Sequence, residues 1–337
     1  MEKEITSTDY PLPPLELLDE YIPESYVLEK EAANGHRPVL RIRSVLCDDE
    51  FRNNRAGLPV AIGRTFDGKV KVLDLSKAPN LLISGATKQG KTVAINAVVA
   101  SLLYSKLPSE LKFVFIDPKG YEYSAYNRIK DSYLAMAPGE ESVVKTLSQT
   151  ENVLASLCRE MERRGGLLRN ASAANISAYK TSALVTLPYI VIVIDEYADL
   201  AIPVHRDRKS RSMSHNISES VLSLAQNGSA VGIHIILSTQ RPSKKVITDS
   251  IRVTFPTRIS VRTVTRSDSR TIIGTSGAEK LLGRGDMILQ TGVETIRLHG
   301  AYISLDEIDR LTSYVESHTV SRSPYYLPEL DLVSAQG

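Results

Sequence analysis

The sequence predicts an α/β fold whose sheet is mostly parallel and is covered by helices on both faces. From residue 81 onward, short apolar runs alternate with longer segments that have helical apolar spacing. Apolar strands flanked by helices indicate a sheet that is buried on both sides. The 337 residues, 42% hydrophobic and 24% charged, suffice for a large domain with an appendage or for two domains. This composition excludes a disordered tail protein, a collagen-like chain and a coiled coil.

The first 78 residues predict two small regions ahead of the main sheet. Residues 1–38 are acidic and contain five prolines, which predicts an extended lead-in with room for one short helix. Residues 39–78 predict a small β-rich segment that leads into the main region. Pro59 assigns the first strand of this segment to a sheet edge, because proline cannot donate a ladder hydrogen bond. The expected elements are a strand over 58–62, a hairpin turn at 66–69 and a strand over 70–75.

Residues 79–320 form the main predicted region, and residues 321–337 a C-terminal tail. Apolar runs predict strands over 81–84, 113–116, 190–194 and 233–237. Helical spacing predicts helices over 91–107, 141–168, 217–231 and 305–317. Three further strands, expected at the sheet edge, cover 258–261, 286–290 and 295–298.

Charge is distributed unevenly along the chain. The 41 basic and 39 acidic residues leave a net charge of +2, which by itself argues against a dedicated nucleic-acid binder such as a histone-like protein. Residues 1–50, however, carry a local charge of −7, and residues 241–270 carry one of +6. The near-neutral total is therefore the sum of opposite patches. The basic side chains of the second patch are Arg241, Lys244, Lys245, Arg252, Arg258, Arg262, Arg266 and Arg270.

Cysteine content and hydropathy bear on the compartment. Cys47 and Cys158 are too few for a disulfide framework or an all-cysteine zinc site, so a reduced cytosolic setting is expected. No secretory signal is visible at the N-terminus. No apolar run approaches the ~18–20 residues that span a bilayer. We expect a soluble, cytoplasmic chain, which a membrane-anchored partner or a missing anchor would place at the inner face of the membrane.

A phosphate-binding sequence lies directly after the strand predicted over 81–84. The pattern G-x-x-x-x-G-K-[ST] is present there, between a strand and a helix, as phosphate binding requires. The glycines allow a tight turn, and successive N–H groups at a helix N-terminus face an anion. Lys91 would reach the β and γ phosphate oxygens, and Thr92 would ligate Mg²⁺. The alternative is a chance glycine-containing turn. The residues expected at ATP are Gly85, Ala86, Thr87, Lys88, Gln89, Gly90, Lys91, Thr92 and Val93.

Two acidic residues end the apolar strand predicted over 190–194. Carboxyl ends of strands are where ligands bind in α/β sheets, so Asp195 and Glu196 are candidate catalytic residues. Asp195 would hold Mg²⁺, directly or through a water, and Glu196 would orient and polarise the attacking water. The alternative is a solvated acidic turn after a core strand.

Polar residues also follow two other predicted strands. Thr239 and Gln240 could sense the γ-phosphate, although a plain polar strand end is the alternative. His234 alternates with core residues and is interpreted as a packed side chain rather than a ligand. Asp117 or Lys119 could line the ATP site or a coupling path, and a simple turn is an equal alternative.

The basic segment 241–270 favours contact with a phosphate backbone over stacking on bases. Phe255 is the only aromatic residue within it, so an aromatic platform for single-stranded bases is not expected. Spaced arginines and lysines without aromatics suit duplex DNA, which they would position without reading its sequence. Charge alone leaves two alternatives open: a solvated face, or arginines that reach the phosphate of a neighbouring subunit.

Together these residues resemble the motor region of the FtsK/SpoIIIE family of DNA translocases, over roughly residues 44–318. The ordered blocks make this similarity far more specific than a phosphate loop alone. The matching stretches are residues 79–85, 115–119, 187–200, 232–242, 256–259, 268–272 and 277–287, together with the lead-in at 13–18 and the closing 326–329.

The resemblance implies a RecA-like P-loop NTPase motor over residues 79–320, which assembles into a hexameric ring around double-stranded DNA and hydrolyses ATP with Mg²⁺ between subunits. Arg270 and the segment 283–286 would lie at the subunit boundary or the nucleotide site. The expected function is ATP-driven movement of chromosome or plasmid DNA at division. Two alternatives remain: a conjugation or secretion ATPase that moves DNA–protein or polypeptide cargo, and a non-enzymatic nucleotide-binding assembly module.

The sequence departs from the family pattern in three places. The small domain that usually precedes the motor is mostly missing, since only residues 25–43 are available for it. The N-terminal membrane anchor and the C-terminal winged-helix module of the family are both expected to be absent. Residues 227–229 replace a basic stretch that ends in an arginine, and losing such a finger costs about 10³–10⁵ in rate. The candidates to replace it are Arg206, Arg208 and Arg211.

Overall fold

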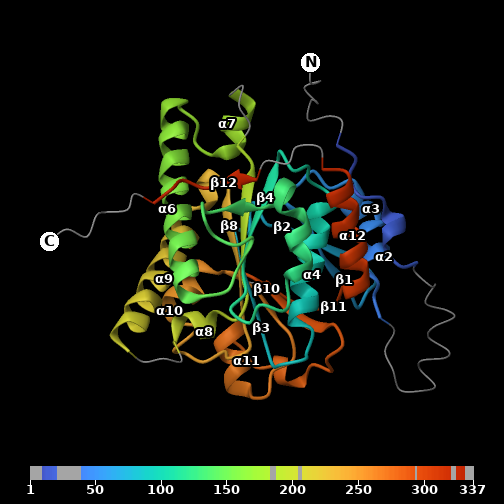
Figure 1. Cartoon of the computed structure of the whole chain (residues 1–337). Helices are drawn as coiled ribbons and strands as arrows, with labels where there is room; N and C mark the ends of the chain where they lie inside the picture. The colour runs from blue at the N-terminus through green and yellow to red at the C-terminus, as the bar shows by residue number, and fades with distance from the viewer. Residues whose placement is uncertain are drawn as a thin grey trace. The chain divides into compact units, whose positions relative to one another are not determined.

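The computed structural model describes residues 10–20, 39–182, 187–203, 207–292, 294–319 and 324–330 (Figure 1). Contacts between residues divide the chain into two units. The first unit comprises Met1–Leu107 and Ile236–Thr319, and the second comprises Pro108–Ile235 and Val320–Gly337. The boundary falls inside strand β8 (Ile233–Thr239), so this strand contributes residues to both units.

Most strands of the first unit lie side by side in a single sheet. The sheet order is β2 (Val70–Asp74), β1 (Pro59–Thr65), β11 (Glu294–Gly300), β10 (Asp286–Thr291), β9 (Thr257–Ser260), β3 (Asn80–Ser84) and then β8. The β3 and β9 strands pair in parallel, with Leu81 opposite Thr257. Antiparallel pairs join β9 to β10, β10 to β11, β11 to β1 and β1 to β2.

Two predictions about the edge of this sheet are wrong. β1 lies between β2 and β11 and not at an edge. Pro59 is tolerated there because it is the first residue of the strand, where a missing N–H does not interrupt the ladder. β9, β10 and β11, predicted over 258–261, 286–290 and 295–298, lie inside the sheet rather than at its edge. Their place follows from long-range pairing with β3 and β1, which a pattern of apolar residues along the chain cannot reveal.

Helices of the first unit begin and end close to the predicted bounds. α4 (Lys91–Leu103) is buried almost all round from Ala94 onward and packs on β1 and β3, as expected for a helix that is apolar on every face. α12 (Leu305–Ser317) coincides with its prediction and starts with a capping box formed by Ser304 and Glu307. The shorter helices are η1 (Leu15–Leu17), α2 (Ile42–Leu46), α3 (Asp49–Arg52), α10 (Asp249–Thr254), α11 (Arg266–Ile273) and η4 (Ala278–Lys280).

The second unit places three parallel strands side by side in the order β7 (Tyr189–Ile194), β4 (Leu111–Ile116) and β6 (Val143–Val144). β12 (Tyr325–Tyr326) pairs in parallel with β5 (Ala135–Met136). The long helices α6 (Leu147–Asn170) and α9 (Arg208–Asn227) pack against each other (Figure 1). The shorter helices are η2 (Ser124–Ile129), α5 (Lys130–Tyr133), α7 (Ile176–Ser182), α8 (Tyr197–Ala201) and η3 (Ser229–Val231).

Capping residues explain where the two long helices start. α6 begins later than the predicted residue 141, because Thr146 and Gln149 form a capping box that fixes its first turn. α9 begins earlier than the predicted residue 217, because the Asp207 carboxylate accepts the N–H of Ser210 at 2.9 Å.

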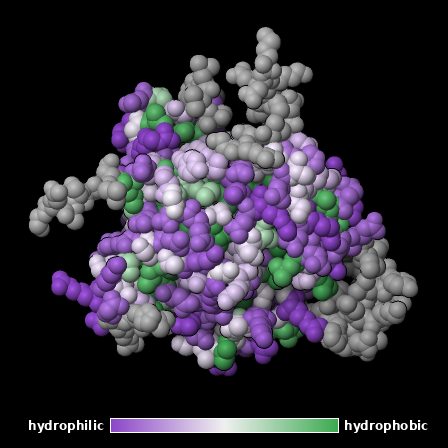
Figure 2. All heavy atoms as spheres, in the orientation of Figure 1, coloured by the Kyte–Doolittle hydropathy of each residue, from purple (hydrophilic) through white to green (hydrophobic). Residues whose placement is uncertain are grey.

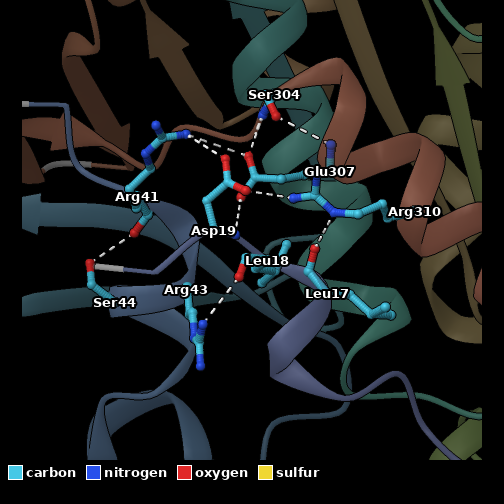
Figure 3. Close-up of polar contacts among 9 residues, drawn as sticks. All are labelled: Leu17, Leu18, Asp19, Arg41, Arg43, Ser44, Ser304, Glu307 and Arg310. Carbon is cyan, nitrogen blue, oxygen red and sulfur yellow. Dashed lines mark hydrogen bonds and ion pairs between the residues drawn. The ribbon is translucent and has the colours of Figure 1, made fainter. Parts of the chain in front are cut away.

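A short N-terminal segment is fastened to the first unit by charged residues (Figure 3). We call residues 13–19 the N-terminal strap. The Asp19 carboxylate accepts hydrogen bonds from Arg310 at 2.6 Å and from Arg41 at 3.2 Å. The fully buried Glu307 carboxylate accepts the N–H of Asp19 at 3.0 Å. Leu18 is buried beneath these contacts, so the strap is held by both apolar burial and ion pairs.

A buried charged cluster ties β12 to α6 within the second unit. Arg164 is fully buried and donates to the Glu160 carboxylate at 2.7 Å and to the carbonyls of Pro188 and Val231 at 2.7 and 3.1 Å. The Tyr325 hydroxyl donates to the same carboxylate at 2.9 Å. The C-terminal residues of the described chain are therefore fixed by a network in which each buried charge has partners.

Hydrophilic residues cover most of the face drawn in Figure 2, and the hydrophobic residues on it form small scattered groups. None of the helices in the described ranges combines the length and hydropathy needed to cross a membrane.

Candidate nucleotide site

The phosphate loop, residues 85–92, connects β3 to α4 and owes its path to its glycines. A Cβ atom on Gly85 would lie 2.4 Å from Cγ2 of Val261, so this position has no room for a side chain. Gly90 has a φ of +100°, which L-residues rarely adopt, although the space around it is open. Lys88 between them also has a positive φ of 60°, so the turn is tight enough to strain a non-glycine residue.

The phosphate loop and the end of β8 are brought together in the first unit. Lys91 is 4% exposed, and its ammonium donates to the Ser238 hydroxyl at 3.3 Å. The Thr87 hydroxyl donates to the side-chain oxygen of Gln240 at 2.7 Å. Sequence reasoning named Gln240 but missed Ser238. The signal was available, because Ser238 is the polar residue that directly follows the apolar run Ile235–Leu237 at the end of β8.

A second loop of the first unit packs on the phosphate loop. A Cβ atom on Gly283 would lie 2.8 Å from the side-chain oxygen of Gln89, so the two loops touch. Three consecutive residues of this second loop have positive φ, namely Gly283 at 77°, Arg284 at 51° and Gly285 at 91°. Asp286, which follows them, is fully buried and accepts the N–H of Leu282 at 2.9 Å. The path of this loop is therefore set by its positive φ values and by Asp286, and Arg284 in it is exposed.

Two buried carboxylates end β7 in the second unit. Asp195 is 1% exposed and its N–H donates to the carbonyl of Ile116 at 2.9 Å. Glu196 is 2% exposed and has left-handed backbone angles, with φ 45° and ψ 57°. A solvated acidic turn is thus excluded for these residues, since both side chains are withdrawn from water. Carboxylates buried in this way require a cation or hydrogen-bond donors nearby.

Lys119 supplies such a cation to Glu196. The Lys119 ammonium lies 3.4 Å from Oε2 of Glu196. The turn that carries Lys119 is fixed by the fully buried Asp117, whose carboxylate accepts the N–H groups of Lys119 and Glu122, each at 3.0 Å. The segment therefore forms a turn, as one of the two alternatives predicts, and Lys119 of this turn reaches a candidate catalytic carboxylate. A place for Asp117 or Lys119 in the ATP site or in a coupling path stays a prediction.

Tyr123 fills the space behind these carboxylates. Burial, and then the charge of Asp195, raises the pKa of the fully buried Tyr123 hydroxyl well above its usual value. Its ring stacks on Phe115 with the ring centres 5.4 Å apart. Tyr123 therefore stays neutral at all physiological pH values and adds no charge beside Asp195.

The residues expected to hold Mg²⁺ and ATP have suitable chemistry. Mg²⁺ prefers oxygen ligands and is typically bound by one or two carboxylates together with substrate phosphates. Thr92 and Asp195 supply a hydroxyl and a carboxylate of this kind. Among the described residues, no group of three or more His, Cys, Asp or Glu side chains forms an all-protein metal cage. Thr92 and Val93 lie in the first turn of α4, where N–H groups are free of intrahelical partners and can face a phosphate.

The basic segment 241–270 belongs to the first unit, and half of its residues are exposed. Phe255 is fully buried, which leaves no aromatic platform on this segment for stacking bases. Arg258 is half-buried and donates to the carbonyl of Phe255 at 2.9 Å and to Gln290 at 3.2 Å, so it serves the fold rather than a ligand. Arg252 is also half-buried. The exposed cations are Arg241, Lys244, Lys245, Arg262, Arg266 and Arg270.

Residues 227–229, which replace a basic stretch ending in an arginine in the family pattern, include a glycine that the fold requires. A Cβ atom on Gly228 would lie 2.5 Å from the carbonyl oxygen of Leu224, so the turn after α9 needs glycine there. Of the arginines proposed as replacements, Arg208 and Arg211 are exposed in the first turns of α9. Arg206 lies outside the described residues.

Relatives with known names match most of this chain. DNA translocase FtsK of Chlorobaculum tepidum is 43% identical over 309 residues, which cover 89% of this chain and 37% of that protein. DNA translocase FtsK of Haemophilus influenzae is 38% identical over 318 residues, which cover 86% of this chain and 57% of that protein. The chain thus spans well under two thirds of the length of these relatives.

The fold is also found in a solved structure. The pCW3 conjugation coupling protein TcpA, in its monomer form with ATPγS, matches with a TM-score of 0.71 and 25% identity, over 84% of this chain and 75% of that one. This confirms the predicted α/β, RecA-like P-loop fold. The FtsK/SpoIIIE family itself matches residues 41–244, which is more than half of the chain. The resemblance inferred from the sequence is therefore confirmed: this chain belongs to the FtsK/SpoIIIE family.

Proposed function

We propose that this chain is an ATP-driven motor that moves double-stranded DNA and works as a homo-oligomeric ring. The observation that carries the proposal is the phosphate loop of a family member, with its two glycines required by the backbone and Lys91 buried against Ser238. A lysine held inside the fold beside this loop is suited to phosphate binding. Relatives named DNA translocase support duplex DNA as the cargo.

The chain's own residues divide the work of hydrolysis. The phosphate-loop N–H groups and Lys91 bind and orient the phosphates, and Gln240, linked to Thr87, responds to the γ-phosphate. Thr92 and Asp195 are the residues that would hold a Mg²⁺ ion, which when bound would neutralise charge on the phosphates. Glu196 orients the attacking water and accepts a proton from it. These assignments use each residue for chemistry that its side chain can perform.

DNA contact is assigned to the exposed cations of segment 241–270. Each subunit supplies a small number of phosphate contacts, and a ring adds them around the duplex. Because bound cations displace counterions, DNA affinity should fall steeply as salt concentration rises. The small net charge of the subunit is compatible with this arrangement, since no single subunit has to hold the DNA alone.

The central experiment measures ATP hydrolysis with and without linear duplex DNA, alongside the mass of the assembly in solution. We expect stimulation by DNA in the wild type and its loss in Lys91→Ala. Lys69→Ala removes an exposed lysine that pairs with Asp67 at 3.4 Å and should behave as the wild type. A Lys91→Ala protein that kept its DNA-stimulated activity would contradict the assignment.

A conjugation or secretion ATPase is the second candidate, favoured by the similarity to a conjugation coupling protein. The same assay separates the two, because a motor for polypeptide cargo should hydrolyse ATP at a rate that linear duplex DNA leaves unchanged.

A further inference from the structure

The contact between Lys119 and Glu196 joins a surface turn to a buried carboxylate of the second unit. Glu196 is 2% exposed, whereas the side chain of Lys119 is 37% exposed, and the two charged groups are 3.4 Å apart. The proposed function gives Glu196 a direct task and gives Lys119 none. A cation placed on a candidate catalytic carboxylate therefore needs an explanation.

Lys119 is placed by its backbone and does not reach Glu196 by chance. Asp117 is fully buried and accepts the N–H of Lys119 through one oxygen and the N–H of Glu122 through the other. The N–H of Gly120 closes the turn on the carbonyl of Asp117 at 3.0 Å. The turn then emerges at Tyr121, which is 85% exposed. Both ends of the turn are thus anchored on Asp117, while its tip at Tyr121 and part of the Lys119 side chain are exposed, where a bound partner can reach them.

Glu196 is equally constrained on its side of the contact. Its left-handed backbone, at φ 45° and ψ 57°, is unfavourable for a residue with a side chain. Such a conformation persists where the surroundings enforce it, and it sets the direction in which the side chain leaves the strand. The backbone angles of Glu196 and the anchored turn at Lys119 therefore together place the carboxylate next to the ammonium.

An ammonium in this position competes with water for the carboxylate. In hydrolysis the water oxygen bonds to the γ-phosphorus, the bond to the β–γ bridging oxygen breaks, and a proton of the water passes to Glu196. The carboxylate oxygen must accept a hydrogen bond from that water beforehand. While Lys119 donates to the same group, this acceptor is occupied and drawn toward the turn.

We propose that Lys119 is a positioning residue that holds Glu196 in a resting pair, and that bound DNA, whose phosphates attract the partly exposed Lys119 ammonium away from the pair, releases Glu196 for hydrolysis. This inference rests on the proposed function and names the regulation of its site. Lys119 acts through Glu196 and does not itself contact the reacting atoms.

The kinetic test compares Lys119→Ala with the wild type in the absence of DNA. We expect the DNA-free kcat to rise about fivefold, the factor that corresponds to ~1 kcal/mol of a partly exposed ion pair, with KM for ATP unchanged. Stimulation by duplex DNA should shrink by the same factor. Lys119→Arg keeps the pair and should restore the low DNA-free rate, and Lys69→Ala, which breaks an exposed pair of equal length, should change nothing. A DNA-free rate that is equal to or below the wild-type rate in Lys119→Ala overturns the proposal.

A second test needs neither nucleotide nor activity. Lys119→Ala, Glu196→Gln and the double variant are unfolded thermally, and the coupling between the two positions is taken from the cycle. For each variant, the unfolding equilibrium constant is divided by that of the wild type. If the pair exists, the product of these ratios for the two single variants should be about fivefold larger than the ratio for the double variant. Independent effects would show that no pair exists to be released.

The two failures can be told apart. If duplex DNA does not stimulate the wild type, the proposed function is contradicted, and the DNA-free rates still decide whether Lys119 restrains Glu196. If DNA stimulates the wild type but Lys119→Ala has no raised DNA-free rate, the function stands and the role of Lys119 is refuted.

Discussion

Arg164→Met tests how much of the stability of the second unit resides in a single buried guanidinium. The substitution keeps the apolar stem and removes the charge from a residue that is fully buried in α6. It leaves the carbonyls of Pro188 and Val231 without this donor, and it removes one of the partners of Glu160. Taking one partner from a buried ion pair costs about 3–5 kcal/mol, so we expect a loss of that size in the free energy of unfolding.

Arg163→Met is the matched control, because Arg163 donates to the same carboxylate at 2.7 and 2.8 Å but is 47% exposed. Its loss should cost under about 1 kcal/mol, as is usual for pairs in contact with water. Burial raises the pKa of Glu160, but its bonds to the two arginines outweigh burial and hold that pKa below the usual value. The contribution of Glu160 should therefore be present above about pH 4.5 and decline below it.

Urea unfolding followed by far-ultraviolet circular dichroism measures both variants, with tyrosine fluorescence as a second probe, since the chain has 15 tyrosines and no tryptophan. Equal shifts of the urea midpoint in Arg164→Met and Arg163→Met would refute the argument, because burial would then not set the size of the effect.

Three further outcomes are expected. Gly85→Ala should weaken binding of a fluorescent ATP analogue about tenfold, because the new Cβ would lie 2.4 Å from Val261; unchanged affinity would contradict this. Glu307→Ala should lower the free energy of unfolding by about 2 kcal/mol, because Glu307 is fully buried and forms the capping box of α12. Asp19→Ala should lower it by under about 1 kcal/mol, because the Asp19 side chain is 43% exposed. Calorimetry that found the reverse order would be inconsistent with the strap geometry. Burial lowers the pKa of Lys112 from 10.5 to about 8, so the folded chain binds fewer protons than the unfolded chain between these values. The free energy of unfolding should therefore rise with pH across this range, by about 1.4 kcal/mol per unit, and Lys112→Met should lack the rise in urea titrations.

Much of the fold could be predicted from local patterns, and the exceptions have physical causes. β7 and β8 are fully buried and lie where apolar runs predicted them, although His234 interrupts the run of β8 and this strand continues to Thr239. Sheet order depends on pairing between distant segments, which is why β9 to β11 were wrongly placed at an edge. α2 and α3 were not predicted, because four or five residues are too few to establish helical spacing.

The candidate site likewise has one part that a local pattern predicts and one part that depends on contacts between distant residues. The phosphate loop has a sequence pattern, and its glycines are required by the backbone as that pattern implies. The contacts of Lys91 with Ser238 and of Lys119 with Glu196 join residues 147 and 77 positions apart, and no local pattern encodes them. Sequence could name the chemistry of these side chains, but only the fold could show which of them meet.

The N-terminal strap has a mechanical consequence if the chain is put under tension. A pulling force applied ahead of residue 10 would first load the carbonyl of Pro14, which accepts a hydrogen bond from the Tyr104 hydroxyl at 3.3 Å. It would next reach the carbonyls of Leu17 and Leu18, which accept from Arg310 and Arg43, and only then the carboxylate of Asp19 (Figure 3). The force would therefore enter the first unit both through α12, which carries Glu307 and Arg310, and through Tyr104 at the C-terminal end of α4. Tension on the N-terminal side would thus bear on the helix that begins at Lys91 of the phosphate loop as well as on α12.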